Sequence, residues 1–141
     1  MTVAVHQVVV CGGRDFVPSD GDAVVLSVWL AARVPLVLHH GDARGADRWA
    51  AGVAARVPGV TVIAHPAQWA EHGRSAGPRR NAAMLTVARA AAAAWGRLPE
   101  LLAYPGGRGT DDMVDKARRA GIPVVAVLAL TAPVPTPTIT G

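Results

Sequence analysis

The clearest candidate for chemistry in the sequence is a glycine-rich turn between an apolar run and a helical pattern, Pro105-Gly106-Gly107-Arg108-Gly109-Thr110. Glycines allow main-chain N–H groups to approach a phosphate with no Cβ in the way. We expect Thr110 to cap the helix that follows, whose N-terminus would favour an anion. The turn is therefore predicted to bind phosphate. The alternative is a plain strand-to-helix turn in which Asp111 and Asp112 complement the helix dipole.

A second turn of this kind follows an earlier apolar run, His40-Gly41-Asp42-Ala43-Arg44-Gly45-Ala46-Asp47. Gly41 and Gly45 flank Arg44, whose planar guanidinium suits phosphate. We expect Arg44 to hold a phosphate and Asp47 to bind either a ribose hydroxyl or Arg44. The alternative is that Asp47 caps the helix or pairs with Arg48 or Arg44 on the surface.

The third turn, Gly12-Gly13-Arg14-Asp15-Phe16, follows the first apolar run. Gly12, Gly13 and Arg14 are candidate ligand-binding residues. The turn lacks the complete G-x-G-x-x-G dinucleotide fingerprint, so a conventional NAD dehydrogenase is not supported. Phe16 is predicted either to pack in the core or to lie near the ligand.

The fourth motif is a polar stretch that leads into a helix, from Trp69 through Gly73-Arg74-Ser75-Ala76-Gly77-Pro78-Arg79-Arg80-Asn81 to Met84. Arg79, Arg80 and Asn81 would occupy the first helical turn, where cations oppose the helix dipole. A locally unfavourable choice of this kind often marks a functional site. We expect Arg80 to face a crevice and Met84 to pack inward. Trp69 is predicted either to stack on a base or to anchor the loop.

The sequence gives no sign of a metal, a cofactor or a serine nucleophile. The histidines at 39, 40, 65 and 72 show no zinc-type pairing at i, i+3 or i, i+4, and Cys11 has no partner cysteine. We expect His39 to be a hydrogen-bonded core histidine. Neither a G-x-S-x-G elbow nor a G-x-x-x-x-G-K-[ST] loop is present, so serine hydrolases and P-loop NTPases are not indicated.

Apolar runs and helical patterns alternate along the chain, which predicts an α/β fold. The expected strands are 8–11, 35–39, 60–64, 101–104 and 124–128, and the expected helices are 20–33, 45–57, 78–95 and 110–120, the last with Gly121 at its C′ position. We predict a single Rossmann-like, three-layer domain with a mostly parallel sheet of about five strands. Ligands bind such sheets beyond the carboxyl ends of the strands, where three of the glycine turns should converge.

Length and composition fit a single domain. The chain has 141 residues, is 51% hydrophobic and carries a net charge of +4, with arginine supplying all but one of its basic residues. We assign residues 1–130 to the domain and expect the Pro/Thr-rich tail, residues 131–141, to be disordered. No apolar run is long enough for a bilayer, and we recognise no signal peptide. With a single cysteine, these features predict a cytoplasmic protein.

In this order, the four motifs resemble the SLOG superfamily of Rossmann-like nucleotide-ligand domains, and most closely its YspA-type (cpYpsA-related) branch. The resemblance runs from about Val8 to Val127. The turn 41–47 is also similar to one in the DNA-processing protein A family. The pair formed by 80–84 and 105–110 is similar to the lonely-guy phosphoribohydrolases, which release a base from a nucleoside monophosphate with an Arg and a Glu.

The lonely-guy resemblance places the enzyme's Arg at Arg80 and its Glu at Met113, which cannot ionise. Asp112 stands one residue earlier and is the candidate substitute, so Arg80 and Asp112 are the tentative catalytic pair. Glycosidic cleavage needs a carboxylate near the anomeric carbon, to stabilise an oxocarbenium-like state or to steer water.

Three functions follow. The first is a domain that senses or sequesters a phosphate-bearing nucleotide or nucleotide-derived ligand, as the resemblance to nucleotide-signalling proteins implies. The second is an N-glycosidase or phosphoribohydrolase acting on a nucleoside monophosphate or ADP-ribose-like compound. The third, single-stranded DNA binding, is disfavoured by sparse aromatic residues and by arginines that gather at turns. The resemblance also implies a homo-oligomer, for which the Ala-rich helix 82–95 offers a packing surface.

Overall fold

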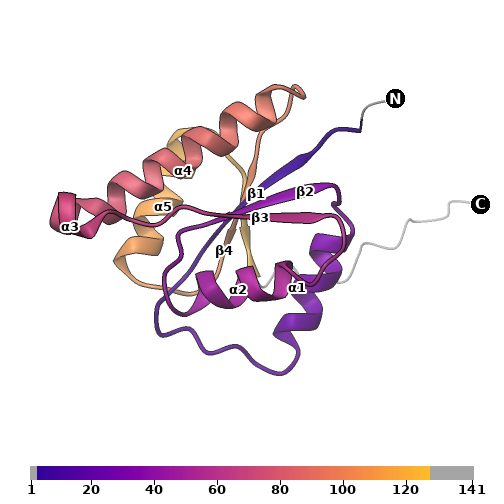
Figure 1. The fold of residues 1–141 in the computed structure, drawn as a ribbon, viewed down its shortest axis with the longest axis horizontal. Coiled ribbons are helices and arrows are strands. Elements are labelled where there is room, and N and C mark those ends of the chain that lie inside the picture. The colour runs from indigo at the N-terminus through magenta and orange to yellow at the C-terminus, as the bar shows by residue number, and fades with distance from the viewer. Residues whose placement is uncertain (1–2, 128–141) are drawn as a thin grey trace, which may run out of the picture.

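Five parallel strands form the central sheet of the protein, seen in a computed structural model that describes residues 3–127 (Figure 1). The sheet order is β3-β2-β1-β4-β5. The strands are β1 (His6–Cys11), β2 (Leu36–His40), β3 (Val60–Ala64), β4 (Glu100–Ala103) and β5 (Val124–Ala126). The chain builds outward from β1 to β3 and then returns to β4 on the other side of β1. That reversal creates a crevice beyond the carboxyl ends of β1 and β4.

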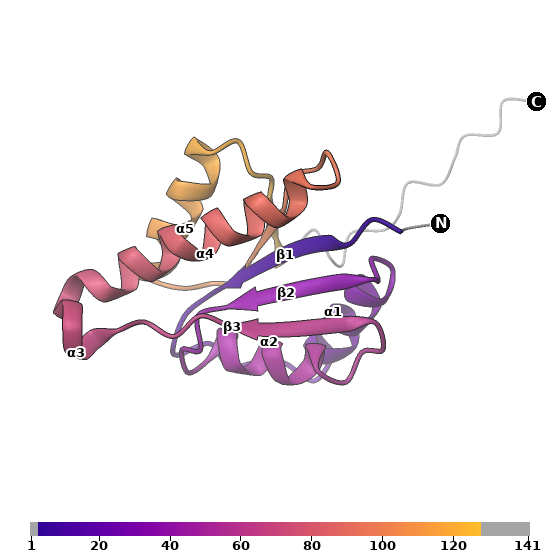
Figure 2. The same cartoon turned by 45° about the horizontal axis from the view of Figure 1, so that its top comes forward.

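Helices cover both faces of the sheet and make three layers (Figure 2). One face carries α1 (Asp22–Ala31) and α2 (Ala46–Ala54), and the other carries α4 (Ala76–Ala93) and α5 (Arg108–Arg119). A short helix, α3 (Trp69–His72), and a 3-10 turn, η1 (Gly73–Ser75), lead into α4. Within residues 3–127, no helix combines the length and apolar character needed to cross a bilayer.

Alternation along the strands divides the core between the two faces. Val8, Val10 and Leu38 pack in the cluster beneath α1 and α2, whereas Val9 and Leu101 join the cluster beneath α4 and α5. All five of these side chains are fully buried. The strands are apolar on both sides because a parallel sheet covered by helices exposes neither face.

The predicted single Rossmann-like domain with about five parallel strands is confirmed. Two local expectations differ from the structure. Helix α5 begins at Arg108, so its N-cap is Gly107 and the predicted capping role of Thr110 is wrong. Helix α4 begins at Ala76 rather than at the predicted Pro78, so Arg80 and Asn81 lie in its second turn and not in its first. Residues 131–141, the predicted disordered tail, lie outside the described residues, as does Leu128 of the last expected strand.

Glycines let the strand-ending turns pack directly against one another. The Gly13 N–H donates to the Pro105 carbonyl at 2.8 Å, and the Gly13 carbonyl accepts from the Ala46 N–H at 3.1 Å. A Cβ on Gly12 would lie 2.5 Å from the Cβ of Ala46, and one on Gly45 would lie 2.4 Å from the Gly13 oxygen. Gly45 also has φ +84°, which L side chains rarely adopt. These glycines therefore serve turn-to-turn packing.

Gly45→Ala should destabilise the fold by at least about 2 kcal/mol, because it combines a disfavoured backbone conformation with a main-chain clash. The matched control is Gly52→Ala in α2, where a Cβ would meet no atom within 4 Å. That change should stabilise the fold by about 0.5–1 kcal/mol through helix propensity. Urea unfolding followed by circular dichroism measures both changes. Equal stability of the two variants would contradict this account of the turns.

Candidate functional site

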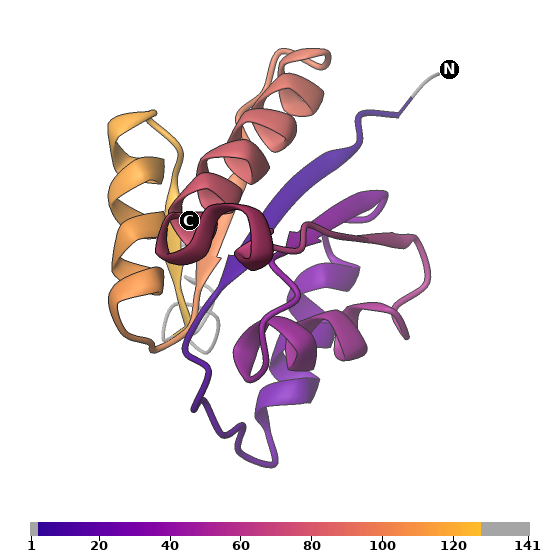
Figure 3. The ribbon, with the colours of Figure 1, turned by 60° about the vertical axis from the view of Figure 1, so that its left-hand side comes forward.

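A cavity of about 500 Å³ opens at the carboxyl end of β1, between the first turns of α4 and α5. Figure 3 views the molecule with α3 and the start of α4 in front, between α5 on one side and α1 and α2 on the other. The lining residues come from five parts of the chain, namely Val10, Cys11, Gly12, Gly13, Arg14 and Asp15; Asp47; Trp69 and Arg74; Gly77, Pro78, Arg80, Asn81 and Met84; and Gly107, Arg108, Gly109, Thr110 and Asp112.

Most of the residues proposed from sequence meet in this cavity. Those that line it are Gly12, Gly13, Arg14, Asp47, Trp69, Arg80, Asn81, Gly107, Arg108, Gly109, Thr110 and Asp112. The cavity lining does not include Gly41, Arg44, Gly45, Arg79 or Gly106. Among the residues that the sequence reasoning did not select, Arg74 and Asp15 add charged groups to the wall. The convergence of separate turns follows from the parallel sheet, whose strand ends share one edge.

The two arginines outside the cavity have other partners. Arg44 lies 3.6 Å from Asp15, and their side chains are 69% and 96% exposed. Arg79 donates from Nε to the Ser75 hydroxyl at 3.1 Å on the exposed side of α4. Arg48 pairs with Asp42 at 3.3 Å. None of these residues pairs with Asp47, so both surface pairings considered for that carboxylate are wrong.

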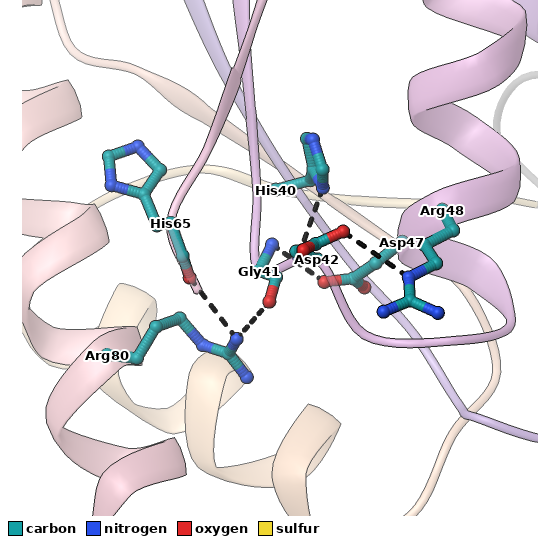
Figure 4. Close-up of polar contacts among 7 residues, drawn as sticks. All are labelled: His40, Gly41, Asp42, Asp47, Arg48, His65 and Arg80. Atoms are coloured by element: carbon teal, nitrogen blue, oxygen red, sulfur yellow. Dashed lines mark hydrogen bonds and ion pairs between the residues drawn. The ribbon is translucent and has the colours of Figure 1, made fainter. Parts of the chain in front are cut away.

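Asp47 and Arg80 bind the two main-chain polar groups of Gly41 (Figure 4). The Asp47 carboxylate accepts from the Gly41 N–H at 2.8 Å, while Arg80 donates from Nη1 to the Gly41 carbonyl and, at 3.4 Å, to the His65 carbonyl. Burial raises the pKa of Asp47, although the Gly41 N–H and the Arg80 charge oppose the shift. Burial also lowers the pKa of Arg80, which remains a cation. The pair fixes the end of β2 against α4.

A chain of hydrogen bonds continues from Arg80 to the far wall of the cavity. Arg80 donates from Nε to the side-chain Oδ1 of Asn81 at 3.0 Å. The Asn81 amide nitrogen donates to Asp112 at 3.0 Å and to the Gly109 carbonyl at 3.3 Å. Both ends of the Asn81 amide are thus occupied within the protein. This predicted ligand-binding residue positions its neighbours and joins α4 to the first turn of α5.

Asp112 faces the cavity as an ionised carboxylate. Burial acts to raise its pKa, but hydrogen bonds from Lys116 and Asn81 outweigh burial and lower the pKa below its ordinary value. Met113, the position assigned to the enzyme Glu by the lonely-guy resemblance, is fully buried in the core and does not line the cavity. The structure therefore directs Asp112 toward the space where a ligand would lie.

The first turn of α5 presents main-chain donors to open space. The first intrahelical bond runs from the Asp111 N–H to the Gly107 carbonyl at 3.0 Å. The N–H groups before Asp111 have no partner within the helix. A Cβ on Gly107 or Gly109 would meet no atom within 4 Å. Unlike the glycines that pack turn against turn, these two leave the cavity wall open to an approaching group.

Trp69 forms part of the cavity rim from α3. Its indole is 48% exposed, and its Cη2 atom lies 3.3 Å from where a Cβ on Gly77 would stand. The Arg14 guanidinium lies 5.5 Å from the centre of the indole ring. The contact joins the turn after β1 to the helix before α4, within the range of a cation–π interaction. Phe16 instead packs with Tyr104 at 5.1 Å and Trp49 at 5.5 Å, as a core residue.

Comparison with known proteins identifies a phage relative. The chain is similar to the Gene 61 protein of Mycobacterium phage D29, with 43% identity over 96 residues that cover 64% of this chain and 70% of the phage protein. The chain belongs to the family of that phage protein. No protein-family model matches it. The name of that phage protein states no activity.

The prediction that His39 is a hydrogen-bonded core histidine is confirmed. His39 is 1% exposed, and its Nε2 donates to the Gln7 side-chain oxygen at 2.7 Å. Its Nδ1 lies 2.9 Å from Nε2 of His65. Burial, with the nearby His65 and His40, lowers the pKa of His39 to about 4. Burial and Asp47 raise the pKa of the Cys11 thiol to about 12, so the thiol is protonated at neutral pH. In residues 3–127, His, Cys, Asp and Glu form no group of three that could hold a metal ion.

The His39 environment predicts acid sensitivity of the fold. Between pH 6.5 and 4 the unfolded chain binds a proton at His39 that the folded protein does not. The free energy of unfolding is therefore unaffected by His39 above pH 6.5 and decreases as the pH falls toward 4. The shift corresponds to a loss of about 3 kcal/mol. The check is urea unfolding at pH 7.0 and 4.5, comparing His39→Gln with His72→Gln outside this hydrogen-bonded group. A loss unchanged in His39→Gln would contradict the assignment.

Proposed function

We propose that the cavity binds a phosphate-bearing nucleotide or nucleotide-derived ligand and that the protein senses or sequesters it. One observation carries the proposal. At the carboxyl ends of the strands, the open first turn of α5 lines the same cavity as Arg14, Arg74, Arg80 and Arg108. Unpaired N–H groups at a helix N-terminus and arginine side chains are the donors that phosphate prefers. The cavity volume of about 500 Å³ suits a small organic ligand.

The rim supports the nucleotide part of the proposal. Trp69 offers a half-exposed aromatic surface beside the phosphate donors, and base–aromatic stacking contributes about 1–3 kcal/mol per base. Arg14, whose guanidinium lies 5.5 Å from the ring centre, places a basic group beside this indole. We therefore assign phosphate to the α5 side of the cavity and the base to Trp69. These assignments agree with the SLOG, YspA-type resemblance, which we retain as part of the proposal.

Gly107→Val is the sharpest variant for testing the site. A Cβ at Gly107 meets only open space, and its φ −101° is ordinary, but its ψ −141° lies beyond the β region, so the variant should fold with a small loss of stability. The valine would occupy the position where a phosphate approaches the α5 amides. Arg80→Ala is less informative, because Arg80 also holds the Gly41 and His65 carbonyls.

The measurement is thermal melting against nucleoside monophosphates, ADP-ribose, cyclic ADP-ribose, NAD and short oligonucleotides. A ligand at a hundred times its Kd stabilises the protein by about 2.7 kcal/mol, which should raise Tm by roughly 8–13 °C. Without ligand, Gly107→Val should melt cooperatively at or slightly below the wild-type Tm, and with ligand it should lose the shift, whereas Gly52→Ala should keep it. No shift with any nucleotide, in protein free of co-purified ligand, would overturn the proposal.

Asp112 supports a second candidate function, an N-glycosidase or phosphoribohydrolase. An ionised carboxylate in the cavity wall could stabilise positive charge on the ribose while the N-glycosidic bond breaks. Water would add to the anomeric carbon, and a proton would pass to the leaving base. Arg80 would then hold the phosphate.

Product analysis separates the two functions. If the protein is an enzyme, chromatography of the ligand after incubation shows free base and ribose phosphate, and Asp112→Asn slows their release by about 10²-fold or more while binding persists. If it is a binding domain, the ligand is recovered unchanged from both proteins. Release of base at equal rates by the wild type and Asp112→Asn would exclude the assigned role of Asp112.

A further inference from the structure

Strand β3 forms one edge of the sheet, and no described segment pairs with its outer side. β3 contacts β2 across its full length and receives α2 on one face. Figure 2 shows β3 along the open border of the sheet, with α4 lying above β1 rather than above β3. Such an edge presents unpaired main-chain groups that can bind another strand.

Two hydrogen bonds determine which β3 residues point their main-chain groups outward. The Leu36 N–H binds the Gly59 carbonyl at 3.1 Å, and the His65 N–H binds the His40 carbonyl at 2.8 Å. In a parallel pair alternate residues bond to the same neighbour, so the odd-numbered residues from 59 to 65 face β2. Val60, Val62 and Ala64 therefore turn their N–H and C=O groups away from the sheet. Of these groups, the Val60 N–H already binds the Val57 carbonyl at 3.2 Å.

Within its five residues, β3 carries neither the charge nor the proline that usually prevents strand pairing. On the α4 side of β3, Ile63 is 39% exposed beside an exposed Thr61. Val87 of α4 is 46% exposed and stands two helical turns after Arg80, on the side of α4 that reaches the β2 and β3 turns. Natural edge strands generally carry charge, proline or a bulge.

We propose that β3 pairs antiparallel with β3 of a second copy of this chain, about a two-fold axis at Val62. In this register Val62 exchanges main-chain hydrogen bonds with Val62 of the second copy, and Val60 faces Ala64. Thr61 then lies opposite Ile63 on the α4 side, and no like charges meet. The result is a continuous ten-stranded sheet. The carboxyl ends of the strands, and with them the two cavities, point in opposite directions in the two copies.

The flanking sequence favours a second copy over an unrelated strand. In the same register Pro58 of one copy stands opposite Pro66 of the other, and both occupy outward-facing positions. Because proline has no N–H, the ladder ends there on both sides. The prolines thus limit pairing to the five-residue strand, and in the two-fold arrangement the two ladders end at the same positions.

Sedimentation velocity over a range of concentrations, from micromolar to millimolar, tests the interface. Ile63→Lys places a charge on the exposed side of the edge and should raise the dimer Kd at least about tenfold. Val24→Lys, on the outer face of α1 where valine is 64% exposed, is the matched control and should leave it unchanged. Circular dichroism establishes that both variants are folded.

Disulfide trapping tests the register. A mixture of Thr61→Cys and Ile63→Cys proteins should form a crosslinked heterodimer faster than either protein forms a homodimer, because only the mixture places two thiols about 4.5 Å apart at the Cα atoms. The buried Cys11 does not compete. A chain that stays monomeric at millimolar concentration, or a dimer weakened by Val24→Lys and not by Ile63→Lys, would overturn the proposal.

Discussion

The close approach of three turns at Gly13 is the constraint on which the rest of the structure depends. Through its main-chain N–H and carbonyl, this one residue ties the end of β1 to the turn after β4 and to the start of α2. Contact at that distance requires glycine at Gly12, Gly45 and Gly106, where a Cβ would overlap neighbouring atoms. Gly12 and Gly13 line the cavity, and the bond from Gly13 to the turn after β4 brings the first turn of α5 to the same cavity.

Charged groups around the cavity divide into two sets with different tasks. Asp47, Arg80 and Asp112 are joined through Gly41 and Asn81 in a continuous series of hydrogen bonds that ends at Lys116. The exposed Arg14, Arg74 and Arg108 stand at the mouth and are free to meet an anion. The joined set fixes the shape of the pocket, because a buried charge that lost its partner would be costly. The exposed set would attract an anion, and its charges stay in contact with water without such a cost.

Local sequence patterns predicted the elements and the meeting of the glycine turns, because strand alternation and turn chemistry are short-range properties. They did not predict which polar groups each side chain contacts. Asn81, predicted to bind ligand, lines the cavity and also joins α4 to α5, a contact across the intervening β4 that no local pattern indicated. Arg44 was expected in the cavity, but it pairs with Asp15 in solvent. Helix α3 places Trp69 at the rim, and no pattern in its four residues predicts a helix.

The most direct test of the central claim is a two-dimensional amide NMR titration with nucleoside 5′-monophosphates and ADP-ribose. If the cavity binds phosphate at the start of α5, the Gly107, Arg108, Gly109 and Thr110 amide signals shift first and most, together with the Trp69 indole signal. Signals of β3 and of the α1 surface should stay in place. Shifts confined to those distant surfaces, or none at saturating concentrations, would contradict the assignment of this cavity as a nucleotide site.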